Sequence, residues 1–376
     1  MSTELVRGDR GDSVLLVTNT LVRLGLLNIA TENFDEKVEE AIKAFQQGRG
    51  ITATGIINPV TARMLEEARW KLGDRVLSIS TGALMHGDDV TSLQTRLIEM
   101  GFNCGKIDGI YGVSTESAVK EFQKSAGLPV DGKFGPATLI ALMRLVKTVS
   151  GGAPAQLREH TYHAQRGPAL ANKVIVLDPS WGGEFTGEVG FGVIESETMF
   201  DIAQRLEGRL IALGVSVYLT RSAKNSPLEN QRIQFTNSVN PDLVIALKVD
   251  KYKNEKANGV ATYYYGSTTH GIHSVIGEKF ANLVQREICA RTEFQNCRTH
   301  PKSWDLLRLI KAPVVRIDFG YLSNPKDAKL LAELKTREQI VESIVIAIQR
   351  LYLSAEEDAK TGTLRISDLR RAGIRK

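Results

Sequence analysis

Cysteine is scarce in this sequence, with three residues among 376, at positions 104, 289 and 297. The odd count and the lack of paired spacing argue against a disulfide framework and favour a reducing compartment. Long apolar runs are also missing, because the longest, such as 344–348, are far too short to span a bilayer. The N-terminal segment contains no apolar core of a secretory signal. We therefore expect a cytoplasmic protein without a membrane span.

The excess of one charge sign is likewise small. The net charge is +5, from 48 basic and 43 acidic residues, and no basic stripe accompanies it. We therefore expect no nucleic-acid partner. Hydrophobic residues make up 42% of the chain and charged residues 24%, which is typical of a globular protein. A chain of 376 residues is too long for one hydrophobic core, so we expect two or three domains.

The first half of the chain contains an internal repeat. Residues 11–25 align with 87–101, and residues 38–65 align with 115–142. Apolar residues recur at three- to four-residue spacing within each unit, and glycine or proline marks the helix ends. Each repeat is therefore predicted to form three short helices.

The pattern changes from residue 173 onward. Strand-like apolar runs are found at 173–177, 215–219, 243–247, 259–265 and 313–318. Helical patterns are found at 195–213, 228–238, 274–291, 325–333 and 336–352. Strands that alternate with helices predict a layered α/β domain, with helices on both faces of one sheet.

Composition indicates the remaining boundaries. The stretch SGGAPAQ at 150–156 is typical of an interdomain linker, and the C-terminal segment lacks apolar periodicity. The predicted organisation is a first repeat over 8–70, a second repeat over 85–146, a linker over 147–172, an α/β domain over 173–353 and a flexible tail over 354–376.

The two repeats resemble peptidoglycan-binding domains of the three-helix type. The second repeat carries the more specific motifs, DGIYG at 108–112, AVKEFQ at 118–123 and GLPVDGKFGPAT at 127–138. The first has NFDEK where the DGIYG motif would fall, so we regard it as degenerate. The resemblance implies that the second repeat binds its ligand through residues of these motifs, namely Asp108, Gly109, Tyr111, Gly112 and Gln123.

Residues 173–352 resemble the zinc-dependent N-acetylmuramoyl-L-alanine amidases of the amidase-3 type. The matching stretches include VIVLDP with GG at 174–183, ESETMFDIAQRL at 195–206, LENQRIQFTNSVNPDLVIAL at 228–247 and APVVRIDFGYLSNPKDAKLL at 312–331. The implied fold is multidomain: two small three-helix peptidoglycan-binding repeats are followed by an α/β amidase-3-like domain with a mixed sheet flanked by helices.

The resemblance implies a zinc ion with three protein ligands, a bound water and a glutamate that moves the proton. The family's first histidine, in a loop that reads D-P-G-H-G-G, falls on Trp181. Its glutamate ligand falls on Glu195, its second histidine on Lys248 and its proton-shuttling glutamate on Asp318. An indole offers no lone pair to a metal, and an ammonium repels a dication. We therefore predict that no catalytic set is intact and that zinc is absent as a cofactor.

The replaced residues form a predicted constellation of their own. We expect the Lys248 ammonium to lie near the vacated metal position and to pair with Glu195, Asp318 or both, with Trp181 as a hydrophobic lid. Simpler interpretations stay open: Trp181 as a packed loop aromatic, Glu195 as a first-turn acid favoured by the helix dipole, and Lys248 as an exposed edge charge.

Other metal-ligating residue types occur in the same half of the chain. His270 lies three residues before His273, and Cys297 lies three residues before His300. Neither pair reproduces a strong zinc signature. We therefore predict no replacement metal site.

Three functions compete. The first is a catalytically inactive amidase relative that binds a muropeptide or peptidoglycan precursor in the cytoplasm and regulates precursor synthesis. Non-secreted actinobacterial proteins with the same layout imply two protein partners, a cytoplasmic cell-wall synthesis enzyme and a membrane flippase. The second function is an active zinc-dependent amidase, an autolysin or endolysin that hydrolyses the bond between MurNAc and L-Ala. The third is a scaffold without muropeptide affinity. We favour the first.

The C-terminal tail adds a candidate modification site. Thr361 and Thr363 stand among basic residues in the segment predicted to be flexible. A solvated tail is the simpler interpretation, and phosphorylation that recruits an arginine-bearing partner is the alternative.

Overall fold

The computed structural model describes most of the chain. The described residues are 4–79, 84–146, 159, 170–250, 252, 254–267 and 271–352. Most of the predicted linker and the whole predicted tail, with Thr361 and Thr363, lie outside the described residues. Contacts divide the chain into unit 1, which comprises Met1–Thr161, Tyr265–Val275 and Pro301–Lys311, and unit 2, which comprises Tyr162–Tyr264, Ile276–His300 and Ala312–Lys376.

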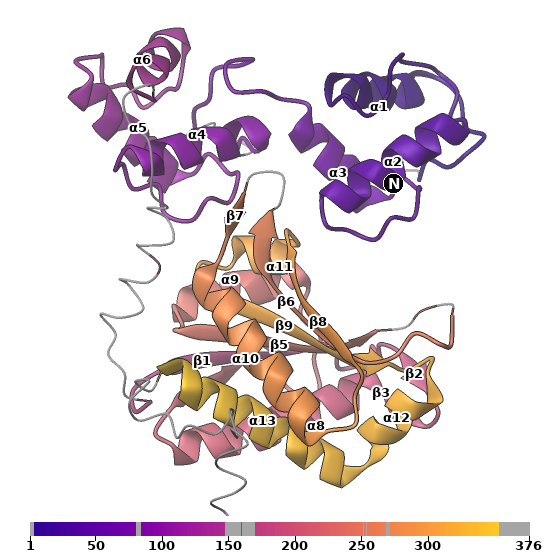
Figure 1. Ribbon diagram of the computed structural model, residues 1–376. Helices are drawn as coiled ribbons and strands as arrows, with labels where there is room; N and C mark the ends of the chain where they lie inside the picture. The colour runs from indigo at the N-terminus through magenta and orange to yellow at the C-terminus, as the bar shows by residue number, and fades with distance from the viewer. Residues whose placement is uncertain are drawn as a thin grey trace, which may run out of the picture. The chain divides into compact units, whose positions relative to one another are not determined.

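Each repeat in unit 1 consists of three helices, which confirms the prediction from periodicity (Figure 1). The helices are α1 (Asp12–Arg23), α2 (Glu36–Gly48) and α3 (Pro59–Ala68) in the first repeat, and α4 (Asp88–Glu99), α5 (Val113–Ser125) and α6 (Pro136–Val146) in the second.

Local sequence explains where these helices begin. The Asp35 carboxylate accepts a hydrogen bond from the N–H of Val38, and Asn58 caps α3 through the N–H of Thr61. Pro59 follows Asn58 in the first turn, where its missing N–H costs no helical hydrogen bond. Each repeat then buries its own small core, so the repeats are separately packed bodies.

Strands and helices alternate from residue 174 onward, as the sequence predicts. The strands are β1 (Val174–Pro179), β2 (Val189–Gly190), β3 (Val193–Ile194), β4 (Ser216–Leu219), β5 (Leu243–Asp250), β6 (Val260–Ser267), β7 (Ile272–His273), β8 (Asn296–Lys302) and β9 (Val314–Tyr321). The helices are α8 (Glu195–Ala212), α9 (Glu229–Val239), α10 (Val275–Arg291), α11 (Asp305–Leu309), α12 (Pro325–Ala332) and α13 (Leu334–Tyr352).

The main sheet is mixed. Its strand order is β4-β1-β5-β9-β6-β7, and β8 pairs with β6. Strands β4, β1, β5 and β9 are parallel, whereas β6 runs antiparallel to β9. The carboxyl ends of β1, β5 and β9 therefore meet at one edge, which is where an open α/β sheet usually forms its site.

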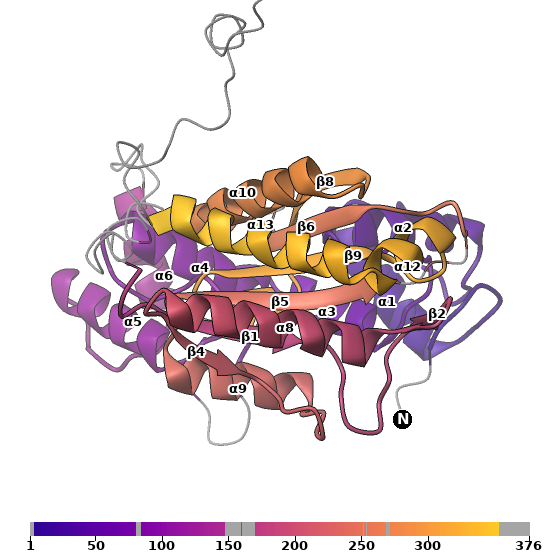
Figure 2. The ribbon, with the colours of Figure 1, turned by 90° about the horizontal axis from the view of Figure 1, so that it is seen from below.

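Helices flank this sheet. Helix α8 packs on β1, β4 and β5, and α13 packs on α8. Figure 2 shows α8 and α13 side by side along the strands. Figure 1 shows α9 on the opposite side of the strands. This placement agrees with right-handed crossovers, because β1 to β4 and β4 to β5 step in opposite directions across the sheet.

The sequence did not predict four of the described strands. Strands β2, β3 and β7 have two residues each, and β8 reads NCRTHPK, a polar stretch with a proline. Such segments carry no apolar alternation, so only backbone pairing defines them as strands. Within the described residues, no helix is both long and apolar enough to cross a membrane.

Candidate functional site

The four positions taken from the amidase resemblance lie together at the carboxyl edge of the unit 2 sheet. Trp181 follows β1, Glu195 begins α8, and Lys248 in β5 pairs in register with Asp318 in β9. The Lys248 Nζ lies 6.0 Å from the centre of the Trp181 ring. A Cβ placed on Gly187 would lie 2.3 Å from the Trp181 ring and 2.5 Å from Glu195 Oε2, so these two side chains flank the same glycine.

A buried arginine holds the loop after β1. Arg221 donates from Nε to the carbonyl of Pro179 and from Nη2 to the carbonyls of Ser180 and Ser196, at 2.8 to 2.9 Å. The loop then turns through Gly182 at φ 147°, where a Cβ would lie 2.4 Å from the carbonyl oxygen of Asn225. Glycine is required there because of this close approach. Burial lowers the pKa of Arg221 to about 10.

Glu195 is fully buried, and its carboxylate is occupied by donors from the protein. Ser180 Oγ donates to Oε1 at 2.6 Å, and the N–H of Glu188 donates to Oε2 at 2.9 Å. The N–H of Val249 is a longer third donor, 3.4 Å from Oε1. Burial raises the pKa of Glu195, while these donors and the Lys248 charge partly oppose that shift. The carboxylate therefore fastens the β1–α8 loop to the end of β5.

Asp318 is paired within its own strand. Arg316 stands two residues earlier on the same face of β9, and its Nε and Nη2 donate to the two carboxylate oxygens at 2.6 and 2.7 Å. Asp318 is 4% exposed, so this bidentate pair is shielded from water. The expectation that Lys248 pairs with Glu195, Asp318 or both therefore fails for Asp318, because the Arg316 guanidinium takes both carboxylate oxygens.

Lys248 lies near the Trp181 ring, and its charge acts on Glu195 without an ion pair. Among the described residues, neither Glu195 nor Asp318 forms an ion pair with its ammonium, although its charge acts on Glu195. Trp181 lies beside it in a left-handed conformation, φ 52°, and is 39% exposed. The ring also contacts Phe185, with centroids 6.4 Å apart. A bulky residue at positive φ is strained, and such strain concentrates at functional sites.

This arrangement does not fit a catalytic zinc ion. Trp181 and Lys248 supply no lone pair in the places of two imidazoles, while Glu195 and Asp318 already accept hydrogen bonds from protein groups. No group of three His, Cys, Asp or Glu residues in the described part of the chain is placed to hold a metal ion. His270 lies outside the described residues, and His300 Nε2 lies 2.7 Å from the carbonyl oxygen of Cys297.

The ligand-binding residues predicted for the second repeat lie in unit 1, in two buried networks. Gln94 binds the side chain of Asp108 through Nε2, at 2.8 Å, and accepts from the N–H of Gly109 at 2.8 Å. Gln123 binds Asp131, at 2.8 Å. Tyr111 is completely buried, and its hydroxyl donates to the carbonyl of Gly132 at 2.7 Å.

These networks limit how the second repeat could bind a ligand. The side chains of Tyr111 and Gln123 are buried and bonded within the repeat, and Gly112 is the N-cap of α5. A ligand would therefore meet the half-buried Asp108 and the outer backbone of its loop before it met the other motif residues. The binding role of the motif stays a prediction.

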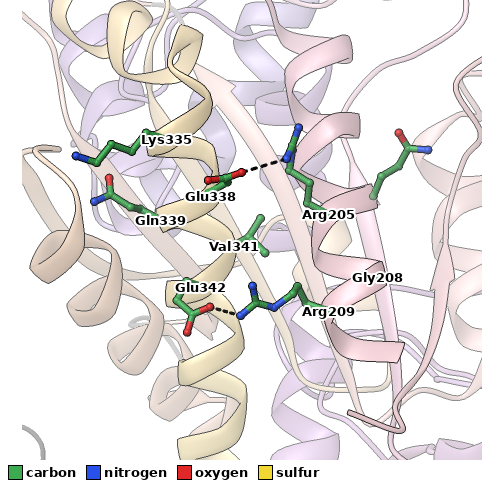
Figure 3. A pocket seen from close by; sticks show the side chains of 9 residues that line it. Arg205, Gly208, Arg209, Lys335, Glu338, Gln339, Val341 and Glu342 are labelled. Atoms are coloured by element: carbon green, nitrogen blue, oxygen red, sulfur yellow. Dashed lines mark hydrogen bonds and ion pairs between the residues drawn. The ribbon is translucent and has the colours of Figure 1, made fainter. Parts of the chain in front are cut away.

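A depression between α8 and α13 is separate from these positions. Its volume is about 680 Å³, and Figure 3 shows that charged side chains line it. Arg205 pairs with Glu338 at 3.7 Å, and Arg209 pairs with Glu342. Most of its charge is thus neutralised across the groove, as on a solvated helix face.

Sequence reasoning missed two residues that decide the chemistry of the site. Ser180 occupies the first glycine position of the loop that reads D-P-G-H-G-G in the family. Its hydroxyl donates a hydrogen bond to the Glu195 carboxylate. Arg316 precedes Asp318 by two residues, a spacing that places both side chains on one face of a strand. Both signals were present in the sequence.

Comparisons with known proteins agree with this architecture. Residues 175–350 match the model of the N-acetylmuramoyl-L-alanine amidase family, and residues 10–65 and 86–142 match a peptidoglycan binding domain. A solved structure of the amidase AmiC2 of Nostoc punctiforme is similar at 24% identity and a TM-score of 0.43, over 49% of this chain and 97% of that one.

Two curated relatives extend the comparison. The germination-specific N-acetylmuramoyl-L-alanine amidase of Bacillus subtilis is 27% identical over 200 residues, which is 49% of this chain and 81% of that protein. The N-acetylmuramoyl-L-alanine amidase CwlM of Mycobacterium tuberculosis is 40% identical over 377 residues, which covers 96% of this chain and 93% of the relative. Because this last match spans nearly the whole length of both proteins, the chain belongs to the N-acetylmuramoyl-L-alanine amidase family.

Proposed function

We propose that this amidase-family protein is catalytically inactive and acts in the cytoplasm as a muropeptide-binding regulator of cell-wall precursor synthesis. The regulated partners would be a cytoplasmic cell-wall synthesis enzyme and a membrane flippase. The observation that carries the proposal is that an indole and an ammonium stand at two of the three metal-ligand positions. The retained Glu195 and Asp318, at the position of the proton-shuttling glutamate, already have partners within the protein.

The surroundings of the site support ligand binding without hydrolysis. The main sheet and the loop clamped by Arg221 are intact, so the sheet edge that carries these positions is built even though two metal donors are replaced. Trp181 and Phe185 are 39% and 60% exposed there and offer ring faces to a ligand, with the Lys248 ammonium beside them. Cysteine is scarce, and the three cysteines form no disulfide within the described residues, which supports a reducing compartment.

An active zinc amidase is the second candidate, and the names of the two relatives, both amidases, favour it. The decisive experiment measures the metal content of protein purified without chelator, together with release of L-alanine amino termini from purified cell walls. We expect substoichiometric zinc and no release. One tightly held zinc ion per chain, with matching hydrolysis, would establish the amidase and overturn our proposal.

A variant designed to regain zinc binding serves as the positive control for the absence of zinc that we expect in the wild type. The fourfold variant Ser180→Gly, Trp181→His, Lys248→His and Asp318→Glu restores the family donors and frees the Glu195 oxygen held by Ser180. We expect it to bind zinc. The matched control keeps Ser180 and carries the other three substitutions, and we expect it to bind zinc more weakly.

Ligand binding is tested on the wild-type chain by titration with a soluble muramyl peptide. Because Trp181 is partly exposed, its fluorescence should change on binding, and the Trp181→Phe variant identifies that part of the signal. Calorimetry without a heat of binding, combined with normal capture of a protein partner, would instead support a scaffold without muropeptide affinity.

A further inference from the structure

Unit 1 contains a segment that is distant in sequence from the repeats. We call Pro301–Lys311 the docking segment; it includes α11 and contacts both repeats. Ser303 Oγ donates to the carbonyl of Arg49, at the end of α2, at 3.0 Å. Arg63 in α3 pairs with Asp305 at 2.7 Å. The first repeat is therefore held at two places by one short segment.

The same segment is bound to α3 by a shielded ion pair. Both Nη atoms of Arg308 donate to the carboxylate of Glu67, at 3.1 and 3.2 Å, and Nη2 also donates to Asp305. The side chains of Arg308 and Glu67 are 15% and 7% exposed. A bidentate pair with this little water around it is screened far less than a surface pair, and removing one partner would leave a buried charge.

The docking segment also covers the loop of the second repeat that carries Asp108 and Gly109. Lys106 Nζ donates to the carbonyls of Leu307 and Ile310, at 2.7 Å each. It also lies 4.6 Å from the centre of the Tyr265 ring, and the Tyr265 hydroxyl donates to the carbonyl of Ile107. The positions just before Asp108 are thus bonded to chain that does not belong to the repeat.

We infer that the docking segment, with Tyr265, is an autoinhibitory element that occupies the Asp108 loop and competes there with a peptidoglycan-type ligand. The inference rests on the binding role proposed for the second repeat. A ligand that needs this loop must first displace the segment. Its apparent affinity therefore equals the intrinsic affinity multiplied by the fraction of molecules in which the loop is open. Displacement would also break the contacts to the first repeat, because one segment makes both sets.

The test compares three full-length proteins with the wild type. Lys106→Met removes the donor to Leu307 and Ile310 without leaving a buried charge. The double variant Glu67→Gln with Arg308→Met removes both partners of the ion pair. The matched control is Lys120→Met in the same repeat, whose exposed ammonium pairs with Glu116 and does not contact the docking segment.

Binding to purified peptidoglycan sacculi and hydrogen exchange of the 106–112 amides are measured for each protein. We expect the Lys106 and double variants to bind sacculi about tenfold more tightly than the wild type, with faster exchange in the loop, and the control to be unchanged. Equal binding by all four proteins would overturn autoinhibition alone. Binding by none, even with the loop opened, would overturn both autoinhibition and peptidoglycan binding by the repeat.

Discussion

The two repeats hold one loop in the same way and another loop differently. Gln46 and Gln123 occupy equivalent buried positions, and each accepts a hydrogen bond from a glycine N–H, that of Gly55 at 2.8 Å and that of Gly132 at 2.9 Å. Each amide nitrogen also donates to a loop carbonyl and to a threonine hydroxyl. The loop between the second and third helices is therefore fixed by one glutamine in both repeats.

The loop between the first and second helices shows the difference. In the second repeat, Gln94 binds Asp108 and the Gly109 N–H. The equivalent residue of the first repeat is Thr18, which exchanges two hydrogen bonds with the backbone of Thr31, at 2.8 and 3.1 Å. A shorter side chain reaches a different part of the loop. The DGIYG motif is thus bonded to the glutamine in the second repeat, and the first repeat has neither the motif nor the glutamine.

The largest expected effect on stability comes from removing the buried glutamine that both repeats share. Gln123→Ala and Gln46→Ala each leave a buried glycine N–H and a loop carbonyl without their partner, which should lower the free energy of unfolding by about 3 kcal/mol. Urea unfolding with a probe in each repeat measures the loss, and Lys120→Ala on the surface is the control. A large loss in only one repeat would show that the two networks are not energetically equivalent.

A smaller effect is expected where the repeats differ. Gln94→Thr gives the second repeat the side chain of the first but not its loop, so Asp108 and the Gly109 N–H lose their partner. We expect a loss of about 2 kcal/mol and faster hydrogen exchange at Gly109. Gln94→Glu keeps the length and the acceptor oxygen for the Gly109 N–H but loses the donor to Asp108, so it separates the two contacts. If Gln94→Thr unfolds like the wild type, the glutamine is not what holds the motif.

A third effect is a pH dependence of the free energy of unfolding that we expect for the second repeat and not for the first. Burial lowers the pKa of Lys106 from 10.5 to about 8, and the first repeat has no counterpart of this contact with the docking segment. Between these pH values the unfolded chain binds the proton and the folded chain does not, so the free energy of unfolding rises with pH, by at most about 1.4 kcal/mol per unit. The difference between wild type and Lys106→Met isolates the residue, and a flat difference from pH 8 to 10 would contradict this prediction.

The smallest effect extends the comparison to unit 2, where a carboxylate fixes a loop as the glutamines do in the repeats. Because the Lys248 charge lowers the pKa of Glu195 against the raising effect of burial, Lys248→Met should raise that pKa further. Carboxyl NMR titration follows Glu195 directly. The wild type should lose stability as the pH rises through the raised pKa, since the folded state binds the proton more tightly, and the variant should lose it at higher pH.

The sequence predicted the parts of the fold that carry strong periodicity. Helix α8 was expected over 195–213 and is found at Glu195–Ala212, and strands β1, β4, β5, β6 and β9 were all expected. Strand β8 and helix α11 were not, because β8 is polar and contains Pro301, and α11 has only five residues. Segments of this kind obtain their structure from tertiary contacts, which single-sequence periodicity does not encode.

The candidate site was predicted in position and only partly in chemistry. Resemblance located Trp181, Glu195, Lys248 and Asp318 at one sheet edge. The pairing failed for Asp318, because a choice between two cations depends on side-chain reach and direction rather than on register. Arg316, on the same strand face, presents a planar fork that matches both carboxylate oxygens, whereas a lysine presents a single point of charge.

The crowding around Gly187 constrains how this loop can change over time. A methyl group there would overlap both the indole of Trp181 and the carboxylate of Glu195, and the backbone at φ 69° disfavours side chains in any case. Any side chain at position 187 would have to displace either the loop aromatic or the buried carboxylate. The spacing between Trp181 and Glu195 is thus set by a residue that contributes only its backbone.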